Sequence, residues 1–123
     1  MAKHLETGQL GEIAAAEFLE QQGWRIVERN WRSGRGEVDI IAWSEEEILV
    51  FVEVKTRSGE GNGYGSPEES IDAKKQDQLV RAAGAYMESI DYNWEIRFDV
   101  VAVILKEGKV LEIRHVEDAF FPM

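Results

Sequence analysis

A run of five apolar residues, Ile48 to Val52, constrains the fold of this chain more than any other feature. The run is far shorter than the roughly 18 apolar residues of a membrane span, and it has the length of a β-strand. Because both faces of such a strand are apolar, it must lie in the middle of a sheet with a layer packed on either side. The strand continues to Lys55, so Glu53 and Lys55 lie at the border of this dry region.

The segments around this strand predict an α/β domain with the element order αβββαββ. A helix is expected from about Thr7 to Gln22, where Gly23 supplies the C-cap. A second helix is expected to begin at Ser66-Pro67-Glu68-Glu69 and to end near Ser89, with an interruption near Asp72 that could cap a second start. The expected strands span residues 24–29, 37–43, 48–55, 96–105 and 110–115.

The length of the chain and its lack of cysteine indicate the number of domains and the cellular compartment. A chain of 123 residues fits one domain, which we assign to residues 1–123. The absence of cysteine excludes disulfides and thiolate metal sites, and it favours a reducing compartment. The N-terminal residues lack the apolar segment of a signal peptide. We therefore expect a cytoplasmic protein without membrane contact.

The formal net charge of −10 argues against a protein that coats DNA non-specifically, because phosphate binding relies on Lys and Arg. A local basic surface is still compatible with this charge, and four arginines fall close together between Trp24 and Gly36. The alternative is that these arginines are ordinary solvated surface. The residues of the cluster are Arg25, Arg29, Arg32 and Arg35.

Three charged residues, Asp39, Glu53 and Lys55, form the candidate site. Side chains alternate along a strand, so Glu53 and Lys55 point to the same face. A short link around residues 44–47 joins the second and third strands, which are therefore expected to pair in an antiparallel way, with Asp39 facing Glu53. Two carboxylates are suited to a hard cation such as Mg²⁺, and a neighbouring lysine can orient or activate water and offset charge on a phosphate.

The alternative for this trio is a cross-strand salt bridge on a wet face of the sheet, which contributes at most about 1 kcal/mol. Two observations oppose it. The strand that carries Glu53 is otherwise apolar, so a charge there is costly unless it is paired or bound to metal. The trio also has one more acid than base, which leaves a negative pocket suited to a cation. Glu-x-Lys alone is nevertheless a weak motif.

Glu12 on the first helix, Asp39, and Glu53-Val54-Lys55 together resemble the PD-(D/E)xK nuclease superfamily, and archaeal Holliday-junction resolvases in particular. The chain resembles the YraN-like family of small bacterial proteins along nearly its whole length. One departure from the superfamily pattern is Glu37, which stands where many members have proline. The blocks that carry the family resemblance are Gly8-x-x-Gly11-Glu12-x-x-Ala15, Arg29-Asn30-Trp31-Arg32, Glu37-Val38-Asp39-Ile40-Ile41-Ala42, Val50-Phe51-Val52-Glu53-Val54-Lys55-Thr56-Arg57, Gly65-Ser66-Pro67, Lys75-Gln76 and Arg97-Phe98-Asp99.

The resemblance implies a restriction-endonuclease-like fold, a mixed β-sheet flanked by helices. It also implies that Glu12 joins Asp39 and Glu53 at the metal, directly or through water, and we add the Val54 carbonyl as a further ligand. The expected function is a Mg²⁺- or Mn²⁺-dependent endonuclease that acts on branched or structured DNA, with Lys55 positioning the attacking water. A homodimer is compatible with this function. The expected nucleic-acid contacts are Arg57, Arg32, Arg35 and Lys75.

Two other functions remain open from the sequence. The chain could be a nucleic-acid-binding module of the same fold with little catalysis, or an interaction domain whose acidic surface binds a basic partner. The intact trio favours the nuclease over the binding module, whereas the net charge of −10 favours the interaction domain. Elsewhere, Arg97 and Asp99 share one strand face, where we expect an internal ion pair rather than a metal ligand. His115 is isolated in the sequence and receives no role.

Overall fold

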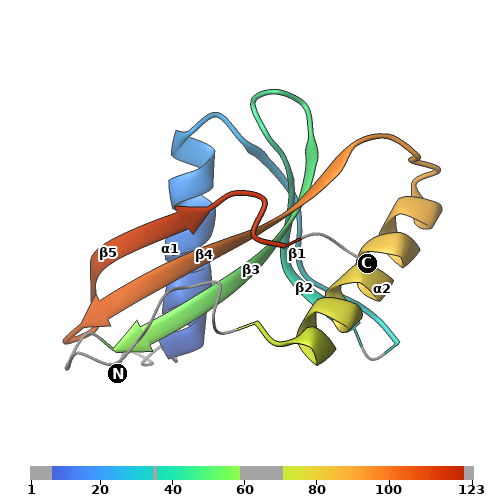
Figure 1. The fold of residues 1–123 in the computed structure, drawn as a ribbon. Helices are drawn as coiled ribbons and strands as arrows, with labels where there is room; N and C mark the ends of the chain where they lie inside the picture. Colours follow the sequence, from blue (N-terminus) through green and yellow to red (C-terminus); the bar gives the residue numbers. More distant parts are fainter. Residues whose placement is uncertain (1–6, 35, 59–70, 121–123) are drawn as a thin grey trace, which may run out of the picture.

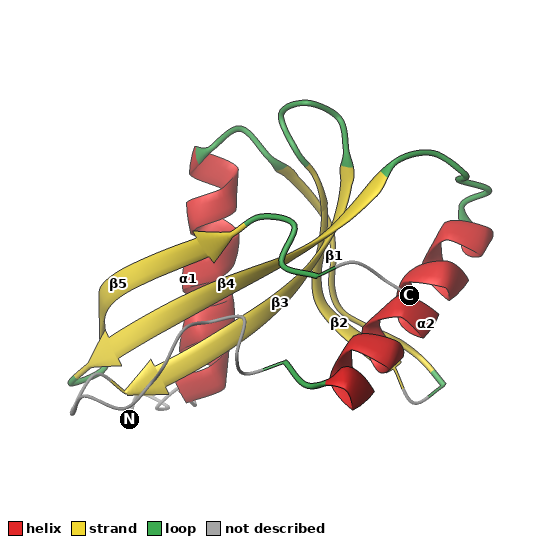
Figure 2. Ribbon diagram, viewed as in Figure 1, coloured by secondary structure: helices red, strands yellow, loops and turns green. Residues whose placement is uncertain are grey.

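The computed structural model describes residues 7–34, 36–58 and 71–120, which form a mixed sheet with one helix packed on each face (Figure 1). The element order is αβββαββ, as the sequence predicts for a restriction-endonuclease-like chain (Figure 2). The elements are α1 (Thr7–Gln21), β1 (Arg25–Ser33), β2 (Gly36–Trp43), β3 (Leu49–Ser58), α2 (Ala73–Ser89), β4 (Ile96–Lys106) and β5 (Lys109–Val116).

The strands lie side by side in sequence order, β1-β2-β3-β4-β5, with β3 in the centre. Neighbouring strands pair in an antiparallel way except β3 and β4, which are parallel because α2 carries the chain back across the sheet between them. The predicted antiparallel pairing of the second and third strands is therefore confirmed. The link between them is tight, since the Ser44 hydroxyl accepts hydrogen bonds from the backbone N–H groups of Glu46 and Ile48, at 3.3 and 3.1 Å.

Each face of the sheet has its own apolar core, as the two-sided apolar strand predicts. Val50 and Val52 of β3 point toward α1, where they pack in one cluster with Leu19. Leu49 and Phe51 point to the other face and pack with α2. The first part of β3 is buried on both sides, and its Glu53 begins the polar end of the α2 face.

Small residues allow α1 to lie very close to β3. A Cβ atom added at Gly11 would lie 1.8 Å from Oγ1 of Thr56, so only glycine fits there. The close approach brings the first turns of α1, including Glu12, to the end of β3 that carries the candidate site.

α2 begins directly after Asp72, which the sequence offers as the cap of a second start. Asp72 is its N-cap, and its side chain accepts a 2.8 Å hydrogen bond from the Lys75 backbone N–H. This position sets Lys75 in the first turn of the helix. The other expected start, residues 66–69, lies outside the described residues. Within the described part of the chain, no helix is both long enough and apolar enough to cross a membrane.

Candidate active site

The candidate site lies where β2 and β3 stop pairing. The backbone ladder between them runs from Trp43 opposite Leu49 to Ile40 opposite Val52. One residue further, Asp39 would stand opposite Glu53. There a side-chain hydrogen bond replaces the backbone pairing, because Oδ2 of Asp39 accepts a 2.8 Å hydrogen bond from the Val54 backbone N–H. The main chain of β3 therefore fixes the Asp39 carboxylate beside Glu53.

The two carboxyl groups interact directly. Burial is the largest effect that raises the pKa of Asp39, to about 7, followed by a hydrogen bond to Glu53 and by repulsion from the Glu53 charge. The Val54 N–H and the Lys75 charge act in the opposite direction and only partly offset these effects. Two carboxylates held this close share a proton, or they share a cation that takes the proton's place.

Glu53 has a buried carboxylate oxygen that accepts no hydrogen bond from a described residue. The residue is only 5% exposed, and among the described residues no donor makes a hydrogen bond to its Oε2. The Lys75 Nζ lies 3.3 Å from this oxygen, so a positive charge is close although it is not aligned as a hydrogen-bond donor. A buried carboxylate oxygen without a donor is costly unless a cation satisfies it.

Two lysines flank the pair in different ways. Lys55 lies two residues beyond Glu53 on β3, on the same face, and it is half-buried. Within the described parts of the chain, Lys55 forms no ion pair. Lys75, for which the sequence predicts phosphate binding, forms an ion pair with Glu53. The sequence signal for this ion pair is the position of Lys75 three residues after the Asp72 cap, in the first turn of α2.

Glu12, on α1, interacts with the site through the charge of Asp39. Burial raises the pKa of the Glu12 carboxyl, and the Asp39 charge raises it further, with a smaller contribution from Glu37. A hydrogen bond from the Asn30 side chain acts in the opposite direction. Asn30 has a positive φ of 52°, a conformation that Asn tolerates better than most residues. The sequence gives Asn30 no function, and its place in the Arg29-Asn30-Trp31-Arg32 block is the one available signal.

The donor set fits a hard cation. Asp39 and Glu53 offer carboxylate oxygens at one point, and Mg²⁺ is commonly held by one or two carboxylates with water in its remaining positions. Within the described residues, no cluster of three or more His, Cys, Asp or Glu side chains is arranged around a common metal position. The Asp39–Glu53 pair is therefore the core of the site, and Glu12 stands further out.

The predicted nucleic-acid contacts differ in their surroundings. The Arg32 side chain is largely exposed, and its Nε lies 3.7 Å from Oε1 of Glu37. Arg57 continues β3 beyond Lys55, and its guanidinium donates a 3.1 Å hydrogen bond to the Thr56 carbonyl. Arg35 lies outside the described residues. Arg57 thus stands nearest along the chain to the candidate metal ligands, and Arg32 lies on β1 opposite Glu37 of β2.

Arg97 and Asp99 form the expected ion pair, with two contacts of 2.8 and 2.9 Å. The sequence misses a third member, His115, whose Nε2 lies 2.8 Å from the buried Asp99 carboxylate. The pairing of Val101 with His115 between β4 and β5 brings these distant residues together. The Asp118 backbone N–H also donates to Asp99, at 3.0 Å. This cluster ties β4 to β5 and to the chain that follows.

Comparison with known proteins identifies the family. Residues 11–103 match the uncharacterised protein family UPF0102. The chain belongs to this family. A UPF0102 protein from Bacteroides thetaiotaomicron is 46% identical over 122 residues, which cover 99% of this chain and 98% of the relative. A UPF0102 protein from Rhodococcus jostii is 47% identical over 121 residues, which cover 98% of this chain and all of the relative. UPF0102 is the YraN-like family, so the predicted membership is confirmed.

Among solved structures, this UPF0102 chain is similar to a repair endonuclease from Pyrococcus abyssi, with a TM-score of 0.49 and 21% sequence identity. The match covers 88% of this chain and 42% of the endonuclease. The chain therefore spans less than half the length of that protein.

Proposed function

We propose that this UPF0102 protein is a metal-dependent endonuclease that hydrolyses phosphodiester bonds in branched or otherwise structured DNA. The observation that carries the proposal is the buried carboxyl pair of Asp39 and Glu53, with its raised Asp39 pKa and the Glu53 Oε2 that lacks a hydrogen-bond donor. Such a pair is unfavourable without a cation and becomes useful with one. The salt bridge between Lys75 and Glu53 does not account for it alone, because the pKa of Asp39 stays raised to about 7 although the Lys75 charge lowers it.

In the proposed site, Asp39 and Glu53 hold Mg²⁺ or Mn²⁺, with the Val54 carbonyl as a further candidate ligand. The ion would polarise the scissile phosphate and lower the pKa of a bound water. The Val54 N–H keeps the Asp39 carboxylate in place while a substrate enters and leaves. Glu12 contributes through its negative charge near Asp39 and is proposed to contact the site through water.

The two lysines have separate proposed tasks. Lys55 shares the strand face of Glu53, so it can orient the attacking water and offset the charge that develops on the phosphate. Lys75 offsets the charge of Glu53 and limits the repulsion between the two carboxylates when no metal ion is bound. Arg57, Arg32 and Arg35 are proposed to contact the DNA phosphates on either side. A homodimer would present two such sites, one for each of two DNA strands.

The alternative is an interaction domain that binds a basic partner through its acidic surface. The net charge of −10 favours this function, since a DNA-binding protein gains affinity from positive charge. It does not explain why two carboxylates are buried against each other. A binding module without catalysis would explain the fold and the arginines but not the position of Lys55 beside the two carboxylates.

A cleavage assay tests the proposal. Purified protein is incubated with duplex, single-stranded, flapped and four-way DNA in Mg²⁺, in Mn²⁺ and in EDTA. We expect metal-dependent cleavage of a branched substrate that is lost in Glu53→Gln and kept in Glu112→Gln, which removes an exposed carboxylate on β5. Cleavage that persists in EDTA, or equally in Glu53→Gln, would contradict the proposal. A protein that binds these substrates in every condition but never cuts them would be the binding module instead.

A further inference from the structure

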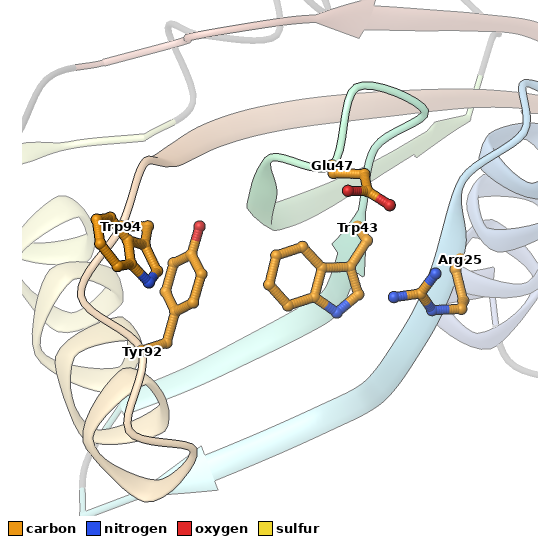
Figure 3. A pocket seen from close by; sticks show the side chains of 5 residues that line it. All are labelled: Arg25, Trp43, Glu47, Tyr92 and Trp94. Atoms are coloured by element: carbon orange, nitrogen blue, oxygen red, sulfur yellow. The ribbon is translucent and has the colours of Figure 1, made fainter.

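A pocket lies at the opposite end of β2 from the candidate site, four residues or roughly 13 Å along the strand from Asp39. Its volume is about 370 Å³. Figure 3 shows its five lining side chains, which come from β1, from the end of β2, from the β2–β3 link and from the chain between α2 and β4. They are Arg25, Trp43, Glu47, Tyr92 and Trp94.

Three of the five lining residues are aromatic. Trp43 and Tyr92 meet edge to face, with ring centroids 5.3 Å apart and an interplanar angle of 78°. The Tyr92 hydroxyl donates a 2.7 Å hydrogen bond to the Glu95 carbonyl, which holds its ring in place. Trp94 lies beside Tyr92 (Figure 3), and 77% of its surface is exposed. A preformed aromatic wall thus ends in a tryptophan that the described protein leaves almost uncovered.

The chain segments that line this pocket are rich in acidic residues. Glu47 lines it directly, its neighbours Glu45 and Glu46 are exposed, and the segment with the two other aromatic residues carries the exposed Asp91 and Glu95. Arg25 is the one basic residue among the five that line the pocket. Its guanidinium carbon lies 6.0 Å from the Trp43 ring centroid, so the pocket already places a cation over an aromatic face.

We propose that this pocket binds a lysine or arginine side chain from a basic segment of a partner protein. The aromatic faces attract a cation, and the Glu47 carboxylate supplies a counter-charge at the same place. The three segments that line the pocket, residues 24–26, 43–47 and 91–95, carry five acids and one base, so they attract a positively charged segment and repel a phosphate backbone. Trp94 would then be covered by the partner, as an exposed aromatic residue at an interface commonly is. This inference does not depend on the proposed nuclease activity.

The test uses fluorescence anisotropy with a labelled hexa-arginine peptide at about 0.15 M ionic strength, where diffuse attraction is partly screened. A protein of this charge attracts any polycation, so the comparison between variants decides the question. We expect Trp94→Ala to weaken binding about fivefold, as the loss of one cation–π contact predicts, and Glu47→Gln to weaken it as well. Arg25→Ala should strengthen binding because it removes a competing cation.

The matched control is Leu111→Ala, which removes an exposed apolar side chain on β5 without changing the charge. It should bind the peptide like wild type. Equal affinity of Trp94→Ala and Leu111→Ala would overturn the proposal, since binding would then be diffuse attraction. Oligothymidylate is the second ligand. If the protein binds it more tightly than the peptide, and Trp94→Ala loses this binding, the pocket binds nucleobases and the proposal is overturned. The melting temperature of each variant shows that it remains folded.

Discussion

Asp39 accepts a 2.8 Å hydrogen bond from the Val54 backbone N–H, one residue beyond Glu53 on the neighbouring strand. The bond joins a side chain of β2 to the main chain of β3 at the point where the two strands cease to pair. It holds two carboxyl groups together that would otherwise repel each other. The chemistry of the site and its effect on stability both follow from this arrangement.

The first prediction concerns pH. In the folded state the pKa of Asp39 is about 7, above its ordinary value of 3.8, so the folded protein binds this proton more tightly than the unfolded chain. The stability linked to the proton is fully present below about pH 4 and is lost as the pH rises through about 7. Without metal, wild type should lose stability relative to Asp39→Asn over this window, as urea denaturation at several pH values would show. Parallel curves for the two proteins would contradict the pKa shift.

The second prediction separates the two lysines. Lys75→Met leaves the buried Glu53 without its counter-charge and should lower the free energy of unfolding by about 1–3 kcal/mol in EDTA. The cost should shrink in Mg²⁺, because the ion takes over the role of Lys75. Lys55→Met should change stability little and abolish cleavage. The opposite pattern, in which Lys55→Met destabilises and Lys75→Met does not, would exchange the roles assigned to the two residues.

The third prediction concerns DNA binding. Each phosphate contact that is lost should reduce the steepness of log affinity against log salt by about 0.9. The double variant Arg32→Ala/Arg57→Ala should therefore flatten the slope by nearly two units. Arg81→Ala/Lys109→Ala is the charge-matched control, with both side chains exposed and neither among the proposed contacts. Equal slopes for the two double variants would show that Arg32 and Arg57 do not contact DNA phosphates.

The fourth prediction concerns the contact between α1 and β3. Gly11→Ala should destabilise the protein strongly, because the new Cβ would lie 1.8 Å from the Thr56 Oγ1. Gly84→Ala is the matched control, since nothing lies within 4 Å of a Cβ at Gly84 on α2. It should be neutral or stabilise by about 0.5–1 kcal/mol, the ordinary gain from alanine in a helix. Thermal unfolding of the two variants would separate them, and a stable Gly11→Ala would contradict the described close approach.

Much of the fold can be predicted because local patterns determine it. The two-sided apolar strand fixes β3 at the centre of the sheet, and the short link after Trp43 makes β2 its antiparallel neighbour. Once that register is set, simple counting places Asp39 opposite Glu53. The same logic predicts the Arg97–Asp99 ion pair, since residues two apart share a strand face.

What the sequence does not predict depends on distant parts of the chain. The ladder between β2 and β3 ends after Ile40, and no local pattern shows that the Asp39 side chain then takes a main-chain hydrogen bond. Lys75 meets Glu53 only because α2 begins at the Asp72 cap and packs across the sheet. His115 joins Asp99 through the register of β4 and β5, across 16 positions in sequence.

The most direct test of the central claim, that Asp39 and Glu53 form a divalent-metal site, is the melting temperature with and without Mg²⁺ or Mn²⁺. A cation bound only to the folded state at about one hundred times its dissociation constant adds about 2.7 kcal/mol, which should raise the melting temperature of a domain this size by several degrees. The rise should vanish in Asp39→Asn and persist in Asp77→Asn, which alters an exposed carboxylate on α2. A wild-type melting temperature that stays the same when either ion is added at millimolar concentration would contradict the metal site. An equal rise in the melting temperature of Asp39→Asn would contradict it too.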